Sequence, residues 1–280
     1  MCVKKIVFDI SKIEFSRKDL KKGITLPTTL TTELAEDIGI HLGDGSMNIF
    51  HNPHGIDYFY KCSGHTENEK EWYDSFIVPL KLRLFNLKIQ AKYLSDNTYG
   101  IQFRSKAIIT FYHKIINLPL GNKVKTIDIP KILKTAPLCV KISCLRGIFD
   151  TDFSLTFKKK HKNTHYYPVI SCSVASKPFI NSIKNILTEL NFKFFDGKFT
   201  SLDKRTNHTK IIYGLFISGK KQLNKWFQLV GSHNPNHITK FEIWKKFGFC
   251  PPKTDLNQRK LILNDIINPL SLENNGPREI

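Results

Sequence analysis

Residues 36–50 read EDIGIHLGDGSMNIF, and residues 145–154 read LRGIFDTDFS. Each stretch begins as an apolar helix, reaches an aspartate, Asp44 or Asp152, and continues as an alternating strand. A carboxylate at the C-terminal end of a helix lies at the negative end of the helix dipole, where a cation would be favoured. The same unfavourable placement occurs twice, which indicates a shared chemical role for the two acids.

Small residues recur on both predicted helices at one spacing. Gly39 and Gly147 each lie five residues before the acid, and Gly43 and Thr151 lie immediately before it. Small residues four apart on one helix face let two helix backbones approach closely. We therefore expect these two helices to pair and to bring the two aspartates together at one end.

Two neighbouring carboxylates at negative helix ends repel each other unless cations lie between them. Mg²⁺ prefers oxygen ligands of this kind and keeps several waters, which leaves room for phosphate oxygens. A metal bound there can activate water and stabilise the leaving oxygen of a phosphodiester. The pair of acids therefore points to metal-assisted hydrolysis of a nucleic-acid backbone.

The elements around the two aspartates follow one order twice. Residues 30–118 predict a helix, a hairpin, a helix interrupted at Pro79, a second hairpin and a final helix. Residues 137–233 repeat this order after an offset of about 110 residues. We expect an α+β fold of two αββαββα units related by a pseudo-twofold axis.

The domain organisation follows from this repeat. We expect an N-terminal arm over residues 1–29, a first unit over 30–118, and a linker rich in Pro, Gly and Lys over 119–136. The second unit covers 137–233, and a C-terminal helix and tail cover 234–280. Trp244 and its aromatic neighbours have helical spacing, which favours a helix that covers the core.

The charge balance points to a polyanionic partner. Forty-three Lys and Arg against 24 Asp and Glu give a net charge of +19, which stores self-repulsion that nucleic acid would relieve. Charge alone does not separate nucleic acid from a ribosomal or membrane surface.

The six cysteines form no C-x-x-C pair, no signal peptide is visible, and no apolar run of about 18 residues occurs. We expect an intracellular protein of the cytoplasm, nucleoid or an organelle, with no membrane span.

Both hinges resemble the LAGLIDADG motif, and the element order resembles a single-chain, two-repeat LAGLIDADG homing endonuclease over roughly residues 30–245. The resemblance implies that the motif helices pack at the centre and that the antiparallel sheets form a saddle over DNA. It also implies that Asp44 and Asp152 bind the catalytic metals and are needed for cutting both strands. The carbonyls of Gly43 and Thr151 would be further metal ligands.

The chain departs from the family pattern at two positions. Phe153 stands where the family usually has Gly, and Leu42 replaces the first acid of the motif, which Asp150 retains in the second copy. That first acid is normally structural. Since neither change removes a metal-binding acid, we expect activity.

The resemblance also implies basic residues near the start of the last helix of each unit. Lys106 and Lys221, with Lys220 beside it, occupy these places. Such a lysine would stabilise charge on phosphate or order the attacking water. The alternative is a solvated lysine in the first turn of a helix.

The position of each aspartate fixes where the following strand begins. Because side chains alternate along a strand, each strand then divides into two faces. Met47 and Leu155 would then point to the helices, and a β-ribbon in the major groove would present its other face to base edges. The alternative for each position is a solvated strand face. The residues expected to face the duplex are Ser46, Asn48, Phe50, Ser154, Thr156, Lys158 and Lys160 on the first strands, and Lys61, Ser63, Ser171 and Ser173 on the second strands.

Two basic runs, FKKKHKNTH at 157–165 and DKRTNHT at 203–209, are expected to contact phosphates, with Lys204 and Arg205 in the second run.

A different pattern superficially suits zinc: His51, His54, Cys62 and His65 are spaced as H-x₂-H-x₇-C-x₂-H. These residues span a hairpin whose faces alternate, and they offer one thiolate. We interpret them as groove-facing or core residues.

Together these observations predict a free-standing, monomeric, intron-encoded homing endonuclease that cuts both strands of double-stranded DNA at a long pseudo-palindromic site. The chain ends in GPREI without the His-Asn that protein splicing would require, which argues against an intein. Mg²⁺ is the expected cofactor, with Ca²⁺ or Mn²⁺ able to substitute for binding. Two alternatives remain open, an RNA maturase that binds its own intron on the same fold and a non-cleaving DNA-binding regulator.

Overall fold

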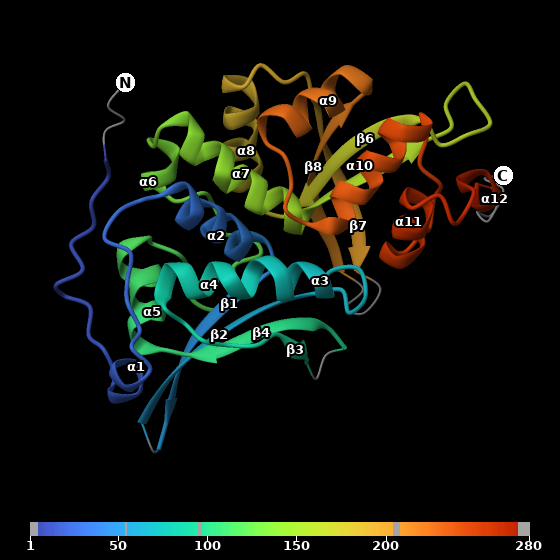
Figure 1. Cartoon of the computed structure of the whole chain (residues 1–280). Coiled ribbons are helices and arrows are strands. Elements are labelled where there is room, and N and C mark those ends of the chain that lie inside the picture. The colour runs from blue at the N-terminus through green and yellow to red at the C-terminus, as the bar shows by residue number, and fades with distance from the viewer. Residues whose placement is uncertain (1–4, 54, 95–96, 204–207, 274–280) are drawn as a thin grey trace.

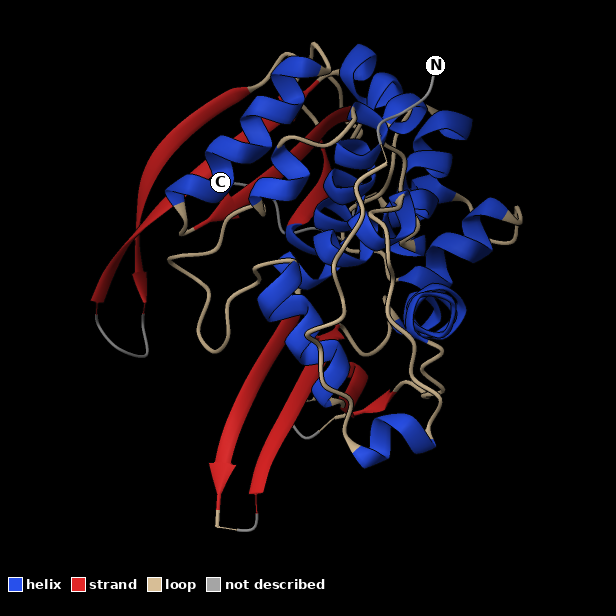
Figure 2. Ribbon diagram, turned by 90° about the vertical axis from the view of Figure 1, so that its left-hand side faces the viewer, coloured by secondary structure: helices blue, strands red, loops and turns tan. Residues whose placement is uncertain are grey.

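The computed structural model describes residues 5–53, 55–94, 97–203 and 208–273, and the fold of these residues is α+β (Figure 1). Two four-stranded antiparallel sheets have the strand orders β1-β2-β4-β3 and β5-β6-β8-β7. The two orders correspond strand by strand, which confirms the repeat predicted from the sequence. Figure 2 shows the strands of both sheets on one side of the molecule and most of the helices on the other.

The first unit, as the name is used below, runs from helix α2 to the turn η2. Its elements in chain order are α2 (Thr32–Gly43), β1 (Gly45–Asn52), β2 (Gly55–Gly64), α3 (Lys70–Trp72), the π-helical turn η1 (Tyr73–Ile77), α4 (Val78–Phe85), β3 (Lys92–Tyr93), β4 (Tyr99–Arg104), α5 (Lys106–Thr110) and the π-helical turn η2 (Phe111–Ile115).

The second unit runs from helix α7 to helix α9 and repeats the order of helices and strands. Its elements are α7 (Leu138–Asp152), β5 (Phe153–Lys158), β6 (Tyr167–Val174), α8 (Lys177–Glu189), β7 (Phe195–Asp203), β8 (His208–Ser218) and α9 (Lys220–Leu229). The apolar helix predicted to reach Asp152 is confirmed, since α7 ends at that residue.

Helices α2 and α7 lie side by side in the middle of the molecule, between the two sheets (Figure 1). A Cβ added to Gly39 would lie 2.2 Å from the carbonyl oxygen of Cys144, and one added to Gly147 would lie 2.2 Å from that of Glu36. Only hydrogen fits at such a distance, so the two backbones are in direct contact. This is the close approach that the spacing of small residues predicts.

Local sequence explains how α2 forms and which way its strand faces. Thr31 caps the helix by accepting a hydrogen bond from the amide of Leu34 at 3.1 Å. Leu34 and Ile38 are fully buried, and each contributes about 1.5–3 kcal/mol on burial. After the helix, alternation buries Met47, as Leu155 is buried in the second unit. The predicted strand phase is therefore confirmed in both units.

The interruption predicted near Pro79 is confirmed, since the helix divides into α3, a π-helical turn and α4, whose first turn contains the proline, because the ring removes one backbone donor. Strand β3, the first strand of the second hairpin, has two residues. Strand β5 ends at Lys158, so Lys160 lies beyond it in a turn with φ 51°, and alternation does not apply to it.

Additional helices cover the ends of the repeat. They are α1 (Arg17–Lys21), α6 (Lys131–Lys134), α10 (Pro235–Phe247), α11 (Leu256–Leu263) and α12 (Pro269–Leu272), of which the sequence predicted α10 alone. Trp244 on α10 is buried and donates from Nε1 to the carbonyl of Tyr166 at 2.8 Å, as a core-covering helix requires. Within the described ranges no helix has the length and apolar character to cross a membrane.

Helix α11 connects the C-terminal segment to the first unit. The amide of Leu256 donates to Asn68 Oδ1 at 2.9 Å, and Lys260 pairs with Glu71. Arg259 is buried between α11 and α10 and donates to Thr239 Oγ1 at 2.9 Å. The contacts of Leu256 and Lys260 join residues almost 200 positions apart. They hold the C-terminal helices against the first unit.

Candidate active site at the paired helix ends

Asp44 and Asp152 lie together where α2 and α7 end. Asp44 is the residue that follows α2, and Asp152 is the last residue of α7. A Cβ added to Gly43 would lie 2.0 Å from Thr151 Oγ1 and 3.3 Å from the carboxyl carbon of Asp152. The small residues before the two acids therefore bring the carboxylates into one site, one from each unit.

The surrounding protein disfavours negative charge on both acids. Burial raises the pKa of Asp44 well above its usual range, and repulsion from Glu69 and Asp152 adds to this, while Lys123 acts in the opposite direction. Burial also raises the pKa of Asp152 to about 6, again against an opposing effect of Lys123. The neighbouring protein groups do not balance the negative charge of the two carboxylates. A bound cation would therefore stabilise their ionised form.

Lys123 supplies an ammonium group that interacts electrostatically with both aspartates. Its Nζ donates to the carbonyl oxygens of Leu42 at 2.7 Å and Gly43 at 2.9 Å, and also to that of His41. Burial lowers its pKa to about 8, opposed by the attraction of both aspartates. Lys123 thus caps the C-terminal end of α2 with the positive charge that the helix dipole favours there.

The end of α7 is capped differently. Asn234 donates from Nδ2 to the carbonyl of Asp150 at 2.9 Å and to Glu69 Oε1 at 3.0 Å. Glu69 also accepts from the amide of His65 at 2.7 Å through Oε2. A third carboxylate therefore approaches Asp44 from the first unit, and the neutral amide of Asn234, which precedes α10, holds it in place.

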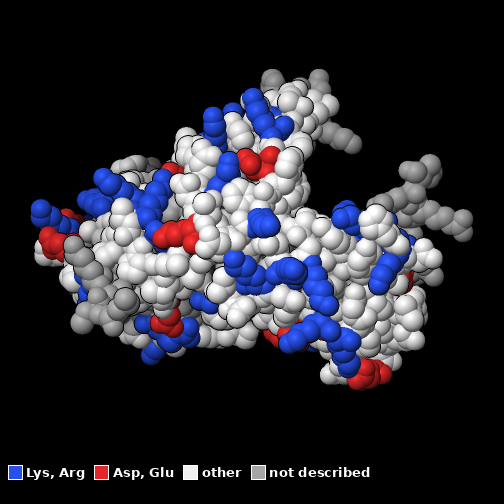
Figure 3. All heavy atoms as spheres, turned by 90° about the horizontal axis from the view of Figure 1, so that it is seen from above, with Lys and Arg blue, Asp and Glu red and all other residues white. Residues whose placement is uncertain are grey.

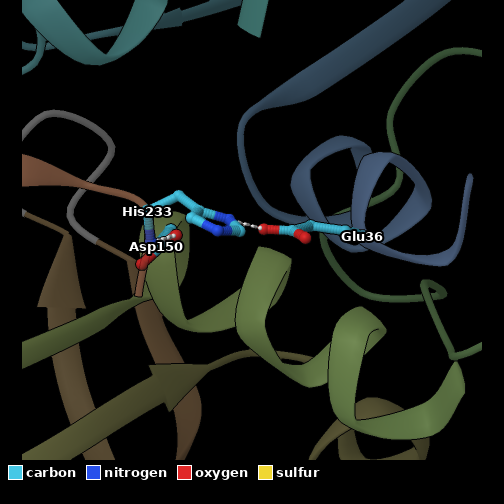
Figure 4. A group of neighbouring side chains, drawn as sticks. All are labelled: Glu36, Asp150 and His233. Carbon is cyan, nitrogen blue, oxygen red and sulfur yellow. Dashed lines mark hydrogen bonds and ion pairs between the residues drawn. The ribbon is translucent and has the colours of Figure 1, made fainter. Parts of the chain in front are cut away.

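A separate polar cluster joins α2 to the second unit (Figure 4). Glu36, Asp150 and His233 offer ligand atoms within 4.8 Å of one another. Glu36 already pairs with His233 Nδ1 at 2.5 Å and with Arg146 at 3.1 Å. Asp150 accepts from Ser232 Oγ at 2.5 Å and from the amide of His233 at 2.8 Å. Because protein groups satisfy both acids, we interpret the cluster as a bridge between the units.

The comparisons with known proteins concern the fold. No protein-family model and no curated protein matches the sequence. The chain is similar in structure to several LAGLIDADG homing endonucleases.

Three of these structures illustrate the similarity. I-LtrWI bound to target DNA shares 13% identity over 88% of this chain and 98% of its own, with a TM-score of 0.44. I-GzeII in complex with its DNA target shares 11% identity over 89% and 99%, with a TM-score of 0.46. Variants of I-DmoI share 15% identity over 72% and 97%, with a TM-score of 0.47. At these values the similarity describes architecture, and function depends on the residues of this chain.

The catalytic role of the two lysines named from the resemblance stays a prediction, and the structure gives their local contacts. Lys106 opens α5 and pairs with Glu14 of the N-terminal arm. Lys221 lies exposed in the first turn of α9 next to Lys220. The ammonium group that the structure places beside the aspartates is that of Lys123. Sequence reasoning missed it because it lies in the connector between the repeats, where no periodicity marks it.

The two predicted carbonyl ligands differ in their contacts. The carbonyl of Gly43 accepts a hydrogen bond from Lys123. Thr151 donates its hydroxyl back along α7 to the carbonyls of Gly147 and Ile148, both at 3.0 Å. A role for either carbonyl in metal binding stays a prediction.

Apart from Lys160, which lies beyond β5, the strand residues predicted to face a duplex share one face of each sheet. This face points away from the helices, and we call it the open face. Ser46 lies opposite Lys61 on neighbouring strands, and Ser154 lies opposite Ser171 with the hydroxyl oxygens 2.9 Å apart. These side chains are partly or fully exposed, as are Asn48, Phe50, Ser63, Thr156, Lys158 and Ser173.

The basic run after β5 is exposed and packs on tyrosines. The ammonium of Lys160 lies 4.0 Å from the ring centre of Tyr167, and that of Lys162 lies 5.1 Å from the ring centre of Tyr166. Lys204 and Arg205, in the other basic run, lie outside the described residues. Figure 3 shows that basic side chains are spread over the face seen from above as well, so charge alone does not locate a partner.

The histidines and cysteine with zinc-like spacing are not arranged as one group. Cys62 is buried, and its thiol lies 3.5 Å from the hydroxyl of Tyr73. His51 lies near the far end of β1, opposite Ile56, whereas Cys62 lies opposite Gly45 at its start. His65 Nδ1 accepts hydrogen bonds from the amides of the next turn, and His54 lies outside the described residues.

Proposed function

We propose that this protein is a site-specific endonuclease that hydrolyses phosphodiesters on both strands of double-stranded DNA. The observation that carries the proposal is the meeting of Asp44 and Asp152 at the ends of two helices in backbone contact. One acid comes from each unit, and the units are related by an offset of 152 − 44 = 108 residues. A duplex has two antiparallel strands related by twofold symmetry, so a pseudo-twofold pair of acids matches one phosphodiester on each strand.

The open faces support duplex DNA as the substrate. Each sheet presents a row of hydroxyl, amide and basic side chains beside the paired acids. Side chains of this kind form hydrogen bonds with base edges in the major groove, and lysines bind phosphates. We propose a long pseudo-palindromic site that spans both sheets. We also propose that the protein acts as a monomer, since one chain supplies both units.

Asp44 and Asp152 would hold the metal that this chemistry needs. Both carboxylates are partly desolvated, and Asp44 is also repelled by Glu69 and Asp152, which fits a divalent cation with a preference for oxygen ligands such as Mg²⁺. When bound, the metal supplies an activated water and charge stabilisation for the leaving oxygen. The Glu36, Asp150 and His233 cluster fits less well because Arg146 and Ser232 already bind its acids.

The protein groups around the acids position them and balance charge. Lys123 fixes the end of α2 and lies close enough to both aspartates to stabilise them electrostatically. A lysine in this place can also stabilise charge that develops on a phosphate during cleavage. Asn234 fixes the end of α7 and holds Glu69, so both helix ends are rigid without a ligand. Such rigidity is what positioning of a reacting group requires.

Selection of cleaved sites from a randomised duplex library tests the proposal. With Mg²⁺ we expect recovery of one long site with approximate twofold symmetry and a break in both strands. The same selection with Ca²⁺ should recover the same site bound and uncut. Binding without cleavage in Mg²⁺ would favour a DNA-binding regulator. Binding to a folded intron RNA, with no duplex cleaved, would favour a maturase.

A further inference from the structure

Arg104 is the last residue of β4 and lies on the open face of the first sheet. It is directly opposite Phe59 on β2, two residues along the strands from the pair of Lys61 and Gln102 and therefore on the same face. Its side chain is 64% exposed, so it can reach a ligand placed over the sheet. It lies on the same face as Ser46 and Asn48, which the proposed function assigns to DNA contact.

Two neighbours on the same face hold the Arg104 guanidinium. Its Nε donates to both carboxylate oxygens of Asp57 at 2.8 Å. The guanidinium carbon lies 5.4 Å from the ring centre of Phe59, so the ring supports it through a cation–π contact. In the described part of the chain, the terminal nitrogens Nη1 and Nη2 have no hydrogen-bond partner. The guanidinium is therefore held through Nε, and its Nη1 and Nη2 are available to donate to a ligand.

Two donors in a fixed plane suit guanine. In the major groove guanine presents two acceptors, N7 and O6, at the spacing of a bidentate arginine contact. Asp57 and Phe59 restrict the side chain before binding, so less rotamer freedom is lost when it contacts a base. A phosphate also accepts such a pair of hydrogen bonds, but it carries no base information, so a base preference at one position distinguishes the two ligands.

The second sheet has no equivalent group. Cys62 and Cys172 occupy the same register positions opposite the residue after each aspartate, so Phe59 corresponds to Val169. The pair of Phe59 and Arg104 then corresponds to Val169 and Ser218. A contact made by Arg104 would therefore occur in one half of an otherwise symmetric site.

We propose that Arg104, positioned by Asp57 and Phe59, contacts a guanine in the half-site bound by the first sheet. The contact would break the symmetry of the target at one base pair. This inference rests on the proposed function and concerns recognition, so its test uses binding rather than cleavage.

The experiment compares binding selections in Ca²⁺ for the wild type, Arg104→Ala, Arg104→Lys and Asp57→Ala. The wild type should require guanine at one position of one half-site. Arg104→Ala should lower that preference about tenfold or more, with the other positions unchanged. Arg104→Lys should restore it only in part, because lysine lacks the planar fork. Asp57→Ala should weaken the same position and no other.

Arg83→Ala is the matched control. Arg83 is also an exposed arginine whose Nε pairs with a carboxylate, that of Glu33 at 2.7 Å, but it lies on α4 away from the open face. It should leave every base preference unchanged. An unchanged guanine preference in Arg104→Ala, or an equal loss at all positions, would overturn the inference while leaving the endonuclease intact. A wild type that binds no duplex would overturn both.

Discussion

Helices α2 and α7 both end at an aspartate, but the residue after the aspartate is small in the first unit and large and aromatic in the second. After Asp44, Gly45 lies so close to the preceding turn that a Cβ would be 2.6 Å from the Cα of His41. After Asp152, Phe153 is buried and packs at 5.8 Å from the rings of both Phe149 and Trp226. The two carboxylates nevertheless lie together, because the contact between α2 and α7 positions them.

The interiors behind the two acids differ in the same way. The first unit buries an ion pair between Asp37 and Lys81, with the oxygen and nitrogen 2.6 Å apart and both side chains at most 1% exposed. Lys81 also lies 4.7 Å from the ring centre of Tyr60. At the offset of 108 residues, Asp37 corresponds to Leu145, which is fully buried in the hydrophobic core. Equivalent backbone positions are therefore supported by a charged interior in one unit and an apolar one in the other.

The caps show a third difference, and this one lies at the site. A lysine caps the first helix and an asparagine caps the second. The two helix ends are matched in geometry and capped by groups of different charge, since the Lys123 cation is bonded to the first helix. The comparison teaches that twofold placement of the acids does not require twofold chemistry around them.

The buried ion pair gives the largest expected effect on stability. Lys81→Met should lower the free energy of unfolding by about 3–5 kcal/mol, because it leaves the Asp37 carboxylate buried without a counter-charge. The double variant Asp37→Leu with Lys81→Met imitates the second unit and should be far closer to the wild type. Urea denaturation of the three proteins measures this. A double variant that is no more stable than the single one would show that the ion pair is not the source of the difference.

The cap on α2 gives the next effect. Lys123→Met should reduce cleavage about 100-fold, because it removes a positive charge beside both aspartates. Since Lys123 is bonded to α2 alone, we expect unequal losses on the two strands, which labelled duplexes resolve. Lys125→Met is the matched control, since Lys125 is an exposed lysine of the same connector. Binding in Ca²⁺ should persist. Equal cleavage by Lys123→Met and the control would exclude the role of Lys123.

The helix contact gives the smallest of these effects. Gly39→Ala should cost about 1–3 kcal/mol in unfolding free energy, because the new Cβ would lie 2.2 Å from the carbonyl oxygen of Cys144. Gly147→Ala should behave alike, since the contact is reciprocal. Thr32→Ala, at an exposed position of α2, should change stability by less than about 0.5 kcal/mol. Thermal unfolding compares them, and glycine variants as stable as this control would refute the backbone contact.

Much of the fold was predictable because it depends on periodicity. The order of helices and strands, the end of α7, the strand phase set by Asp44 and Asp152, and the approach of the two helices all follow from patterns within short windows. The end of β5 and the π-helical turns were missed, since local patterns fix element boundaries poorly.

The remaining site residues could not be predicted because long-range packing brings them in. Lys123 lies 79 residues after Asp44 in a connector without periodicity, and Asn234 follows the last helix of the repeat. Glu69 is one of several acidic residues in the polar stretch where a helix was expected to begin. Lys81 occupied one position of an amphipathic helix, and its burial depends on Asp37 from another element. No local pattern distinguishes these four from solvated residues.

The most direct test of the account replaces each acid in turn. Asp44→Asn and Asp152→Asn keep the size of the side chain and remove its charge, and cleavage of each strand is followed on a labelled duplex in Mg²⁺. We predict that either variant loses double-strand cleavage by a factor on the order of 10³ or more while binding the duplex in Ca²⁺ as before. Double-strand cleavage by either variant at the wild-type rate would contradict the claim that one acid from each unit forms the active site.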